Sequence, residues 1–234
     1  MFKKGQITLF IIIAVVIVAV ILITYFTVFR ETKVQTETKA LAIKNYVEDS
    51  IEKRALIDIL TVSYQGGYAF APEDSFPTPF YQIAYWVEKN ETFYPSIEEI
   101  AANIDFLNTI MGDINLSQAF PDFEISQGTL ESNTTILSEK IKVSIKWPIT
   151  IKKGDIIQKL ENFNFEYNIR LGKIYDVATY VAESVANETL PTNIPPDMNL
   201  TIYTYENASL YEIIDTNENF KINDQYYRFV FAGK

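Results

Sequence analysis

Residues Ile7–Phe29 read ITLFIIIAVVIVAVILITYFTVF, and this run contains no charged residue, glycine or proline. As an α-helix the run would be about 35 Å long, enough to cross a hydrocarbon layer of about 30 Å. A buried core helix is the weaker interpretation, because helices of globular proteins rarely stay apolar on every face for so long. The run therefore predicts a transmembrane helix.

The charges on either side of this run predict its orientation. Lys3 and Lys4 precede the run, whereas 18 basic and all 30 acidic residues follow Phe29. The positive-inside rule then predicts a single-pass protein of the cell membrane, with a cytoplasmic N-terminus and an extracellular C-terminal part. A cleaved secretory signal is the alternative, but the run exceeds the usual 7–15 apolar residues and no A-x-A-like site follows it.

The residues Lys3-Lys4-Gly5-Gln6 stand directly before the apolar run. They resemble the archaeal class III (prepilin-type) signal peptide, and the resemblance covers about the first 30 residues. It implies cleavage between Gly5 and Gln6, with the apolar helix kept as the anchor and as the core of a filament of type IV pilin-like subunits. Phe10 departs from the family pattern, because many type IV pilins carry Glu at this fifth mature position.

The segment after the run has the pattern of an amphipathic helix. From Arg30 to about Leu60 there is no glycine or proline, and Gln65-Gly66-Gly67 marks a turn. Apolar residues recur at spacings of three and four: Ala40, Ile43, Val47, Ile51, Ala55 and Ile59. We therefore expect a membrane-proximal helix over residues 30–62 that continues the transmembrane helix. A separate stalk or core helix is the alternative.

Two further helices are predicted in the C-terminal part. Ser96-Ile97-Glu98-Glu99 is a capping box, and the apolar face that follows runs from Ile97 to Ile114. A second apolar face spans Ile174–Val185, after Gly172.

Strands are predicted from alternation of apolar and polar residues. The clearest run is Ile141–Trp147, and Pro148 places it at an edge or a bend; Phe163–Leu171 alternates as well. Weaker or later strands are expected near Phe123–Ile125, Thr129–Leu137, Leu200–Tyr205 and Tyr226–Phe231. The aromatic run Phe80–Val87 fits a strand or a helix, and its rings are more typical of a core than of a carbohydrate platform.

These elements predict an α+β fold, in which a long N-terminal helix, transmembrane plus amphipathic, precedes a mainly antiparallel sheet with two packed helices. The expected organisation is a basic cytoplasmic leader over residues 1–6, a transmembrane helix over 7–29, an amphipathic helix over 30–62 and an extracytoplasmic domain over 63–234.

Six N-x-[ST] sequons follow the apolar run, and they are the most informative functional marks in the sequence. Their asparagines are Asn90, Asn115, Asn133, Asn187, Asn199 and Asn207. The 16 asparagines and 31 serines and threonines would give only about two such matches by chance. We expect glycosylation of an outward-facing domain, with Asn115 on a predicted helix and Asn199 at a strand start as the weaker acceptors. The alternative is an Asn- and Thr-rich composition without modification.

Composition excludes several kinds of chemistry. The 234 residues include no cysteine and no histidine, which removes disulfides, thiolate metal sites, thiol nucleophiles and histidine-based triads. A formal charge of −10 disfavours binding to nucleic acid. No nucleotide-binding or hydrolase motif occurs and no carboxylate pair stands out, so we expect no catalytic residues, no cofactor and no enzyme activity.

The segment Asp215–Asn219 has oxygen-bearing side chains at alternate positions, as a calcium-binding loop does. Phe220 stands where the calcium loop has glycine, and Tyr226 stands where it has its last glutamate. We therefore expect a solvated turn here and no metal site.

Together the patterns predict a single-pass, membrane-anchored extracellular protein with a structural or interaction role, similar to a type IV pilin and a candidate filament subunit. Its partners would be the lipid bilayer and copies of itself, which meet through Ile7–Phe29. The alternative is a surface ectodomain that does not assemble and instead binds a glycan or an envelope protein, as an adhesin does.

Overall fold

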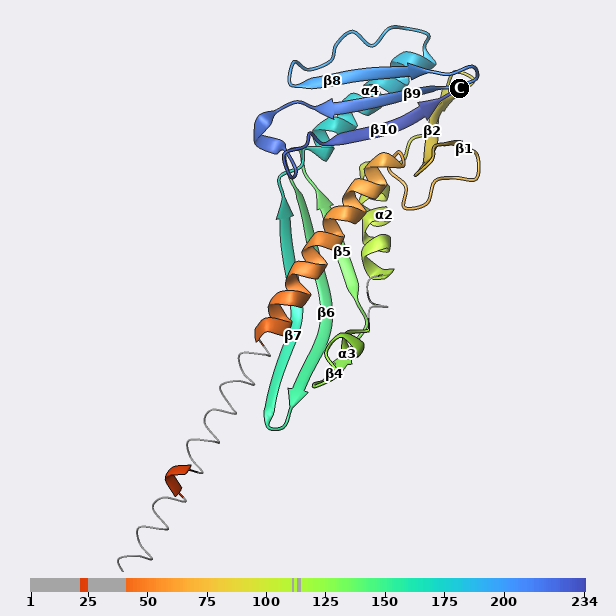
Figure 1. Cartoon of the computed structure of the whole chain (residues 1–234). Helices are drawn as coiled ribbons and strands as arrows, with labels where there is room; N and C mark the ends of the chain where they lie inside the picture. Colours follow the sequence, from red (N-terminus) through yellow and green to blue (C-terminus); the bar gives the residue numbers. More distant parts are fainter. Residues whose placement is uncertain (1–21, 25–40, 111, 113–114) are drawn as a thin grey trace, which may run out of the picture.

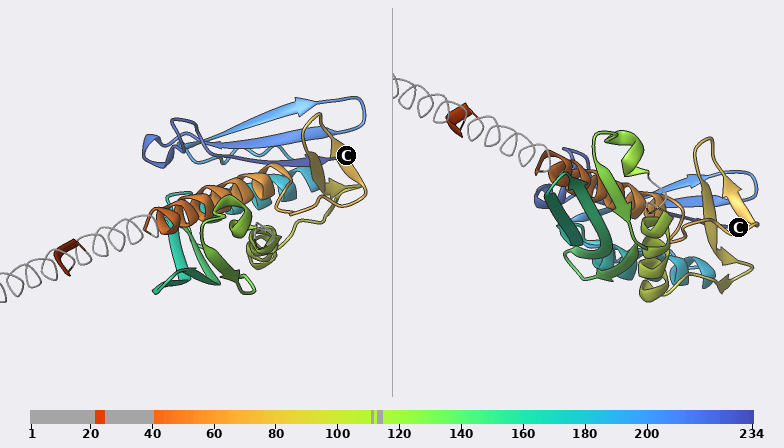
Figure 2. Two further views of the ribbon diagram at one scale, coloured as in Figure 1. Left: turned by 60° about the horizontal axis from the view of Figure 1, so that its bottom comes forward. Right: turned by 90° about the horizontal axis from the view of Figure 1, so that it is seen from below.

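The described part of the chain is an α+β structure with two sheets and a helix packed against both. The computed structural model describes residues 22–24, 41–110, 112 and 115–234 (Figure 1). The helix covers residues 41–64 and is called the spine helix below. Strands β8, β9 and β10 lie on one side of the spine helix and the second sheet lies on the other (Figure 2).

The first sheet has six strands in the order β1-β2-β10-β9-β8, with β3 paired to β2. Its strands are β1 (Ser75–Pro77), β2 (Gln82–Glu88), β3 (Glu91–Thr92), β8 (Met198–Thr204), β9 (Ser209–Asp215) and β10 (Arg228–Gly233). Strands β10 and β2 run parallel and are joined only where Ala232 and Gly233 face Tyr85 and Val87. The other neighbouring strands in this sheet are antiparallel.

The second sheet has four strands around the long central strand β6. Its strands are β4 (Glu124–Gln127), β5 (Glu131–Ile136), β6 (Ile141–Lys153) and β7 (Ile156–Tyr167). Strand β7 lies along one side of β6, whereas β5 and β4 follow each other along the other side.

Pro148 lies inside the central strand, which rules out the predicted edge position and leaves the predicted alternative, a local bend or irregularity. The register between β6 and β7 shifts between Lys146 and Ile149. On the opposite side, the β5 pairing ends at Lys146 and the β4 pairing begins at Ile149. Because both ladders are interrupted at this point, the missing N–H of Pro148 removes no ladder bond.

The spine helix buries the predicted apolar stripe. Ile43, Val47, Ile51, Ala55 and Ile59 are each at most 2% exposed, and Ala40 lies outside the described residues. The Tyr167 hydroxyl of β7 donates to the Glu52 carbonyl at 2.7 Å, and the Trp86 indole of β2 donates to the Gly66 carbonyl at 2.8 Å. Gly66 and Gly67 have φ of +70° and +90°, which suits glycine and ends the helix where the sequence predicts.

Three shorter α-helices follow: α2 (Ile97–Ile110), α3 (Leu116–Ala119) and α4 (Leu171–Ala186). The predicted capping box of α2 is confirmed, because the Glu99 N–H donates to Ser96 Oγ and the Ser96 N–H donates to Glu99 Oε2. Helix α2 is described as far as Ile110, and Met111, Asp113 and Ile114 of the predicted segment lie outside the described residues.

The predicted strand Phe163–Leu171 is wrong at both ends. Strand β7 begins at Ile156 and ends at Tyr167, and Leu171 is already the first residue of α4. Gly172 therefore lies in the first turn of α4, where an added Cβ would lie 2.7 Å from the Leu137 carbonyl oxygen. Tyr167, Ile169 and Leu171 are all buried, so the alternation continues past the end of the strand. Tyr167 belongs to β7, Ile169 to the connection and Leu171 to α4.

The predicted fold class needs correction beyond α+β. No described helix is long and apolar enough to span a membrane, and most of the predicted transmembrane run lies outside the described residues. The spine helix is amphipathic and packs on protein. The single sheet is also wrong, since the strands divide between two sheets. The pairing is antiparallel, as predicted, except between β10 and β2.

The core has two parts, one on each face of the six-stranded sheet. The large cluster joins the spine helix, α4, the inner face of β6 and the aromatic side chains Trp86, Phe229 and Phe231. The small cluster comprises Ile83, Leu210, Val230 and Ala232, under partly buried aromatic residues. Because side chains alternate along β10, these two clusters lie on opposite faces of the sheet.

Candidate functional site

All six sequon asparagines are exposed. Asn90 lies in the β2–β3 turn, Asn187 caps the C-terminus of α4 and Asn207 lies in the β8–β9 turn. Asn133 and Asn199 lie on strands β5 and β8. Exposure is the first physical requirement for an acceptor side chain, and the fold meets it at every sequon.

Three of the sequons gather at one end of the six-stranded sheet. Asn90 Nδ2 donates to Glu188 Oε1 at 3.0 Å, which places the β2–β3 turn beside the Asn187 sequon. Asn90 and Asn207 line the same open cleft of about 390 Å³, together with Lys234. This end of the sheet, marked by the C-terminus in Figure 1, is called the sequon end below.

The remaining three sequons are spread over the molecule. The prediction that Asn115 lies within a helix is wrong, because it is the N-cap residue of α3 and its side chain accepts from the Gln118 N–H at 3.2 Å. This bond uses the amide oxygen, whereas glycosylation uses the amide nitrogen. The side chains of Asn133 and Asn199 make no hydrogen bond with any described residue.

The aromatic run Phe80–Val87 divides into a buried and an exposed part. Trp86 is fully buried and packs on Phe231 with ring centroids 4.7 Å apart, as the core interpretation predicts. Phe80 is 89% exposed, which contradicts that interpretation for the start of the run. With Phe70 and Tyr81 it lines an open cleft of about 350 Å³ that also contains Gln65 and Gln82.

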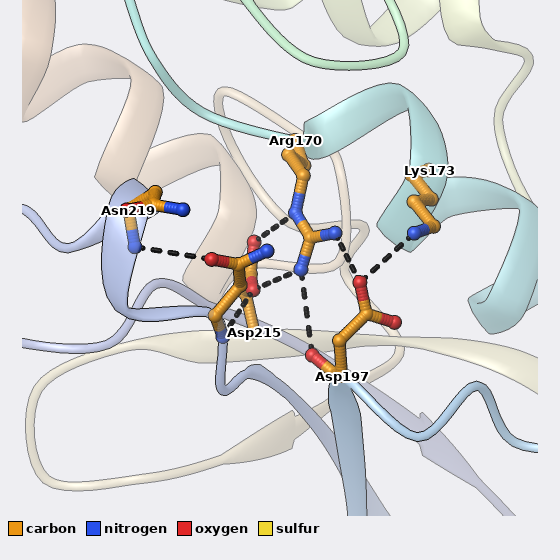
Figure 3. A network of polar contacts seen from close by, with 6 residues as sticks. Arg170, Lys173, Asp197, Asp215 and Asn219 are labelled. Carbon is orange, nitrogen blue, oxygen red and sulfur yellow. Dashed lines mark hydrogen bonds and ion pairs between the residues drawn. The ribbon is translucent and has the colours of Figure 1, made fainter.

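A buried ion-pair network joins α4 to the six-stranded sheet (Figure 3). Arg170, at the N-terminus of α4, donates through Nε to Asp215 Oδ2 at 2.7 Å and through Nη2 to Asp215 Oδ1. Its Nη1 donates to Asp197 Oδ2, which Lys173 Nζ also contacts at 3.0 Å. Arg170 and Asp215 are almost completely buried, so the network fixes three segments that are distant in sequence.

The charges in this network compensate one another. Hydrogen bonds from Arg170 and then Lys173 lower the pKa of Asp197 to about 2. The hydrogen bond to Asp215 raises the pKa of Arg170 above its ordinary value. The Phe220 ring lies 4.8 Å from the guanidinium carbon and covers its remaining face. Two cations facing two carboxylates, all held by hydrogen bonds, form a structural joint between α4 and the six-stranded sheet.

The calcium-like segment takes part in this joint. Asp215 accepts from Arg170 and from the Asn217 N–H, and Asn217 in turn caps the short 3₁₀ helix η2 (Glu218–Phe220). The expected solvated turn is therefore wrong for Asp215, which is 1% exposed. Within the residues that the structure describes, no group of three or more acidic residues could hold a metal ion.

Sequence reasoning missed the Arg170–Asp215 pair because its members are 45 positions apart, Arg170 belongs to no motif, and the calcium-like pattern around Asp215 does not indicate an arginine partner. The predicted processing residues Gly5 and Gln6 lie outside the described residues. Comparison of the chain with protein-family models, with curated proteins and with solved structures gives no match.

Proposed function

We propose that this chain is a membrane-anchored, glycosylated protein of the outer cell surface, with a structural or interaction role similar to that of a type IV pilin. The apolar segment of residues 7–29 anchors it and the two-sheet part faces outward. In the assembling form of the proposal, cleavage between Gly5 and Gln6 precedes packing of the apolar segments of several copies into a filament.

The exposure of all six sequon asparagines is the observation that supports the outward orientation best. Glycosylation needs a surface position on the side of the membrane where the transferase acts. The closed charge network around Arg170 supports a structural role over a catalytic one.

The orientation can be tested with single cysteines, because the chain contains none. Lys159→Cys places a thiol at an exposed position of β7, and Lys4→Cys places one before the apolar segment. A maleimide that cannot cross membranes should label intact cells carrying Lys159→Cys. A Lys4→Cys chain that keeps its leader should be labelled only after lysis, and a chain cleaved after Gly5 loses that thiol. Labelling of Lys4→Cys alone in intact cells would overturn the proposed orientation.

Processing can be tested on protein from native membranes. N-terminal sequencing should give Gln6 as the first residue, whereas a chain that begins at Met1 would contradict the assembling form. Val18→Asp provides a separate test of the anchor, because an acidic residue at mid-bilayer costs about 3 kcal/mol on insertion scales. This variant should leave the membrane fraction, and unchanged fractionation would contradict the anchor.

The glycan claim can be tested by mass spectrometry of tryptic peptides. We expect mass additions at the exposed turn positions Asn90, Asn187 and Asn207, which form the sequon end. Unmodified peptides at all six sequons would remove the glycan from the proposal.

A second candidate function is glycan binding by a surface protein that does not assemble. The cleft lined by Phe70, Phe80 and Tyr81 favours it, because exposed rings beside the amides of Gln65 and Gln82 suit the apolar face and hydroxyl groups of a sugar. Phe80→Ala should abolish capture on a glycan array, with Phe93→Ala, which removes a half-exposed ring outside this cleft, as the control. Equal capture by both variants would exclude this cleft.

A further inference from the structure

Strand β8 is an open edge of the six-stranded sheet. It stands last in the strand order and pairs only with β9, from Met198 opposite Asp215 to Thr204 opposite Ser209. Among the described residues, its other backbone hydrogen bonds are local ones at its two ends, such as Met198 N–H to Pro195. A row of free N–H and C=O groups on such an edge can pair with a strand of another molecule.

The edge strands β1, β3, β5 and β7 are protected by ordinary protein devices, and β4 has only four residues and begins with Glu124. Strand β1 is three residues long and ends in proline, and β3 has two residues. Strand β7 carries Lys159, Glu161 and Glu166. Along β5, helix α2 covers the edge, where Asp105 accepts from the Thr134 N–H at 3.0 Å and from its hydroxyl at 2.7 Å.

Strand β8 has none of these devices. Its sequence, MNLTIYT, has seven residues without a charge or proline, and it is rich in residues that favour strands. In an acidic chain, a strand without charged side chains adds no like-charge repulsion of its own between two copies. The strand does contain one feature of another kind, the sequon Asn199-Leu200-Thr201.

We propose that Asn199 carries an N-linked glycan and that this glycan keeps the β8 edge from pairing with another strand. In the modification, Asn199 Nδ2 bonds to the anomeric carbon of a lipid-phosphate-linked oligosaccharide. The bond from that carbon to the phosphate oxygen breaks with its electron pair, and the amide loses one proton. The proposal rests on the outward orientation proposed above.

The geometry explains how a glycan on this side chain would protect the edge. Asn199 is exposed and stands at the outermost strand, opposite Ile214 of β9. An added strand would lie about 4.8 Å away, with its nearest Cβ atoms about 5 Å from those of β8. A hydrated oligosaccharide on Asn199 is wider than this spacing, so it occupies the place of the incoming side chains.

Two substitutions of Thr201 both remove the glycan, but only one of them leaves the β8 edge uncharged and free to pair. Thr201→Val and Thr201→Lys both destroy the sequon, but only Thr201→Lys adds a charge to the edge, opposite Glu212. Thr135→Val removes the Asn133 sequon from β5, whose edge is already covered, and is the matched control. Asn199→Gln gives a second route to the unglycosylated strand.

The experiment compares these full-length proteins, made in a host that glycosylates secreted proteins and purified in detergent micelles. We expect the Thr201→Val and Asn199→Gln proteins to self-associate roughly tenfold more strongly than the parent, as several new cross-strand contacts would produce. Light scattering measures the association, and hydrogen exchange should show new protection in β8. The Thr201→Lys and Thr135→Val proteins should behave as the parent does.

Two results would overturn the proposal. One is an unmodified Asn199 in a protein whose Asn90 carries a glycan. The other is a modified parent whose Thr201→Val and Asn199→Gln forms show neither stronger association nor β8 protection. In both cases surface labelling of Lys159→Cys would still support the outward orientation, so failure of this proposal is distinguishable from failure of the proposed function.

Discussion

The two sheets bury their side chains in different ways, although both pack against the spine helix. Along β6, buried and exposed residues alternate from Ile141 to Lys152 almost without exception. In β9 and β10 of the six-stranded sheet, buried residues follow one another directly. A sheet with one solvated face shows a period of two, whereas a sheet covered on both faces shows a continuous apolar run.

The solvated face of the four-stranded sheet carries charge pairs. Lys142 lies 3.1 Å from Glu166, and Lys152 lies 3.0 Å from Glu124. The six-stranded sheet instead depends on the buried joint around Arg170, which holds α4 under one face. The comparison therefore predicts that loss of a polar group from the joint around Arg170 lowers the stability of the six-stranded sheet most. In the four-stranded sheet, truncation of an apolar side chain on the buried face of β6 should have the larger effect.

Arg170→Met should have the largest effect, because it leaves the buried Asp215 carboxylate without its partner. We expect a loss of about 3–5 kcal/mol in the free energy of unfolding, measured by urea denaturation of the detergent-solubilised chain. Lys173→Met is the matched control, since Lys173 contacts the same network at Asp197 but is 37% exposed. A loss as large in Lys173→Met would show that the network is not centred on Arg170.

Ile145→Ala tests the buried face of β6. Ile145 is 2% exposed, so its truncation should cost about 2–4 kcal/mol. The adjacent Lys146 points to the opposite, solvated face, and Lys146→Ala should leave stability unchanged within measurement. Equal losses in the two variants, measured by thermal unfolding, would contradict the one-sided burial of this sheet.

Tyr227→Phe tests the connection between the spine helix and the six-stranded sheet. The Tyr227 hydroxyl is buried and hydrogen-bonds to Ser63, whose own hydroxyl donates to the Ile59 carbonyl at 2.7 Å. Because Ser63 keeps that second bond, removal of the tyrosine hydroxyl should cost only about 1 kcal/mol. Tyr226→Phe, whose hydroxyl contacts the exposed Glu218, should not change the melting temperature.

The smallest expected effects concern pH, and they have opposite signs at two carboxyl groups. Hydrogen bonds lower the pKa of folded Asp197 to about 2, so its contribution to stability is present above the unfolded value near 3.8 and is lost as pH falls toward 2. Burial raises the pKa of folded Asp58, and this outweighs the attraction of Arg54. Ionisation of Asp58 therefore reduces stability as pH rises above 3.8.

At pH 7, Asp197→Asn should lower stability and Asp58→Asn should raise it, each by no more than about 1 kcal/mol. The two differences from the parent should disappear at low pH, near pH 2 for Asp197→Asn and below pH 4 for Asp58→Asn. Melting curves from pH 2 to pH 7 measure both. Destabilisation by Asp58→Asn at neutral pH would show that its pairing with Arg54 outweighs burial.

The same contrast explains what could be predicted from sequence. Periodicity predicts the stripe of the spine helix, the α4 face and the start of β6, because each element faces solvent on its other side. The capping box of α2 follows from its four-residue motif. Strand β9 gave no signal, since Tyr211 to Ile213 are buried in succession. Pro148 led to the wrong edge prediction, because a central strand tolerates proline where its pairing with both neighbouring strands is interrupted. The local sequence does not reveal these interruptions.

At the candidate site, sequence reasoning located the asparagines but not their arrangement. The gathering of Asn90, Asn187 and Asn207 depends on strand order, which no sequon encodes. From sequence, Asn199 is expected to be a weaker glycosylation acceptor because it stands at a strand start. Only the strand order shows that this strand is an open edge.

The junction of β2 with β10 affects how the chain can fold during synthesis. Lys234 bonds to Asp74, 160 positions earlier, and its backbone pairs with Val87 and Lys89. The β5–β6–β7 hairpins are local and can form early, whereas β2 must wait for β10 to be made. A chain that ends before Arg228 can therefore complete the four-stranded sheet, whereas its six-stranded sheet still lacks the strand that joins β2 to β9.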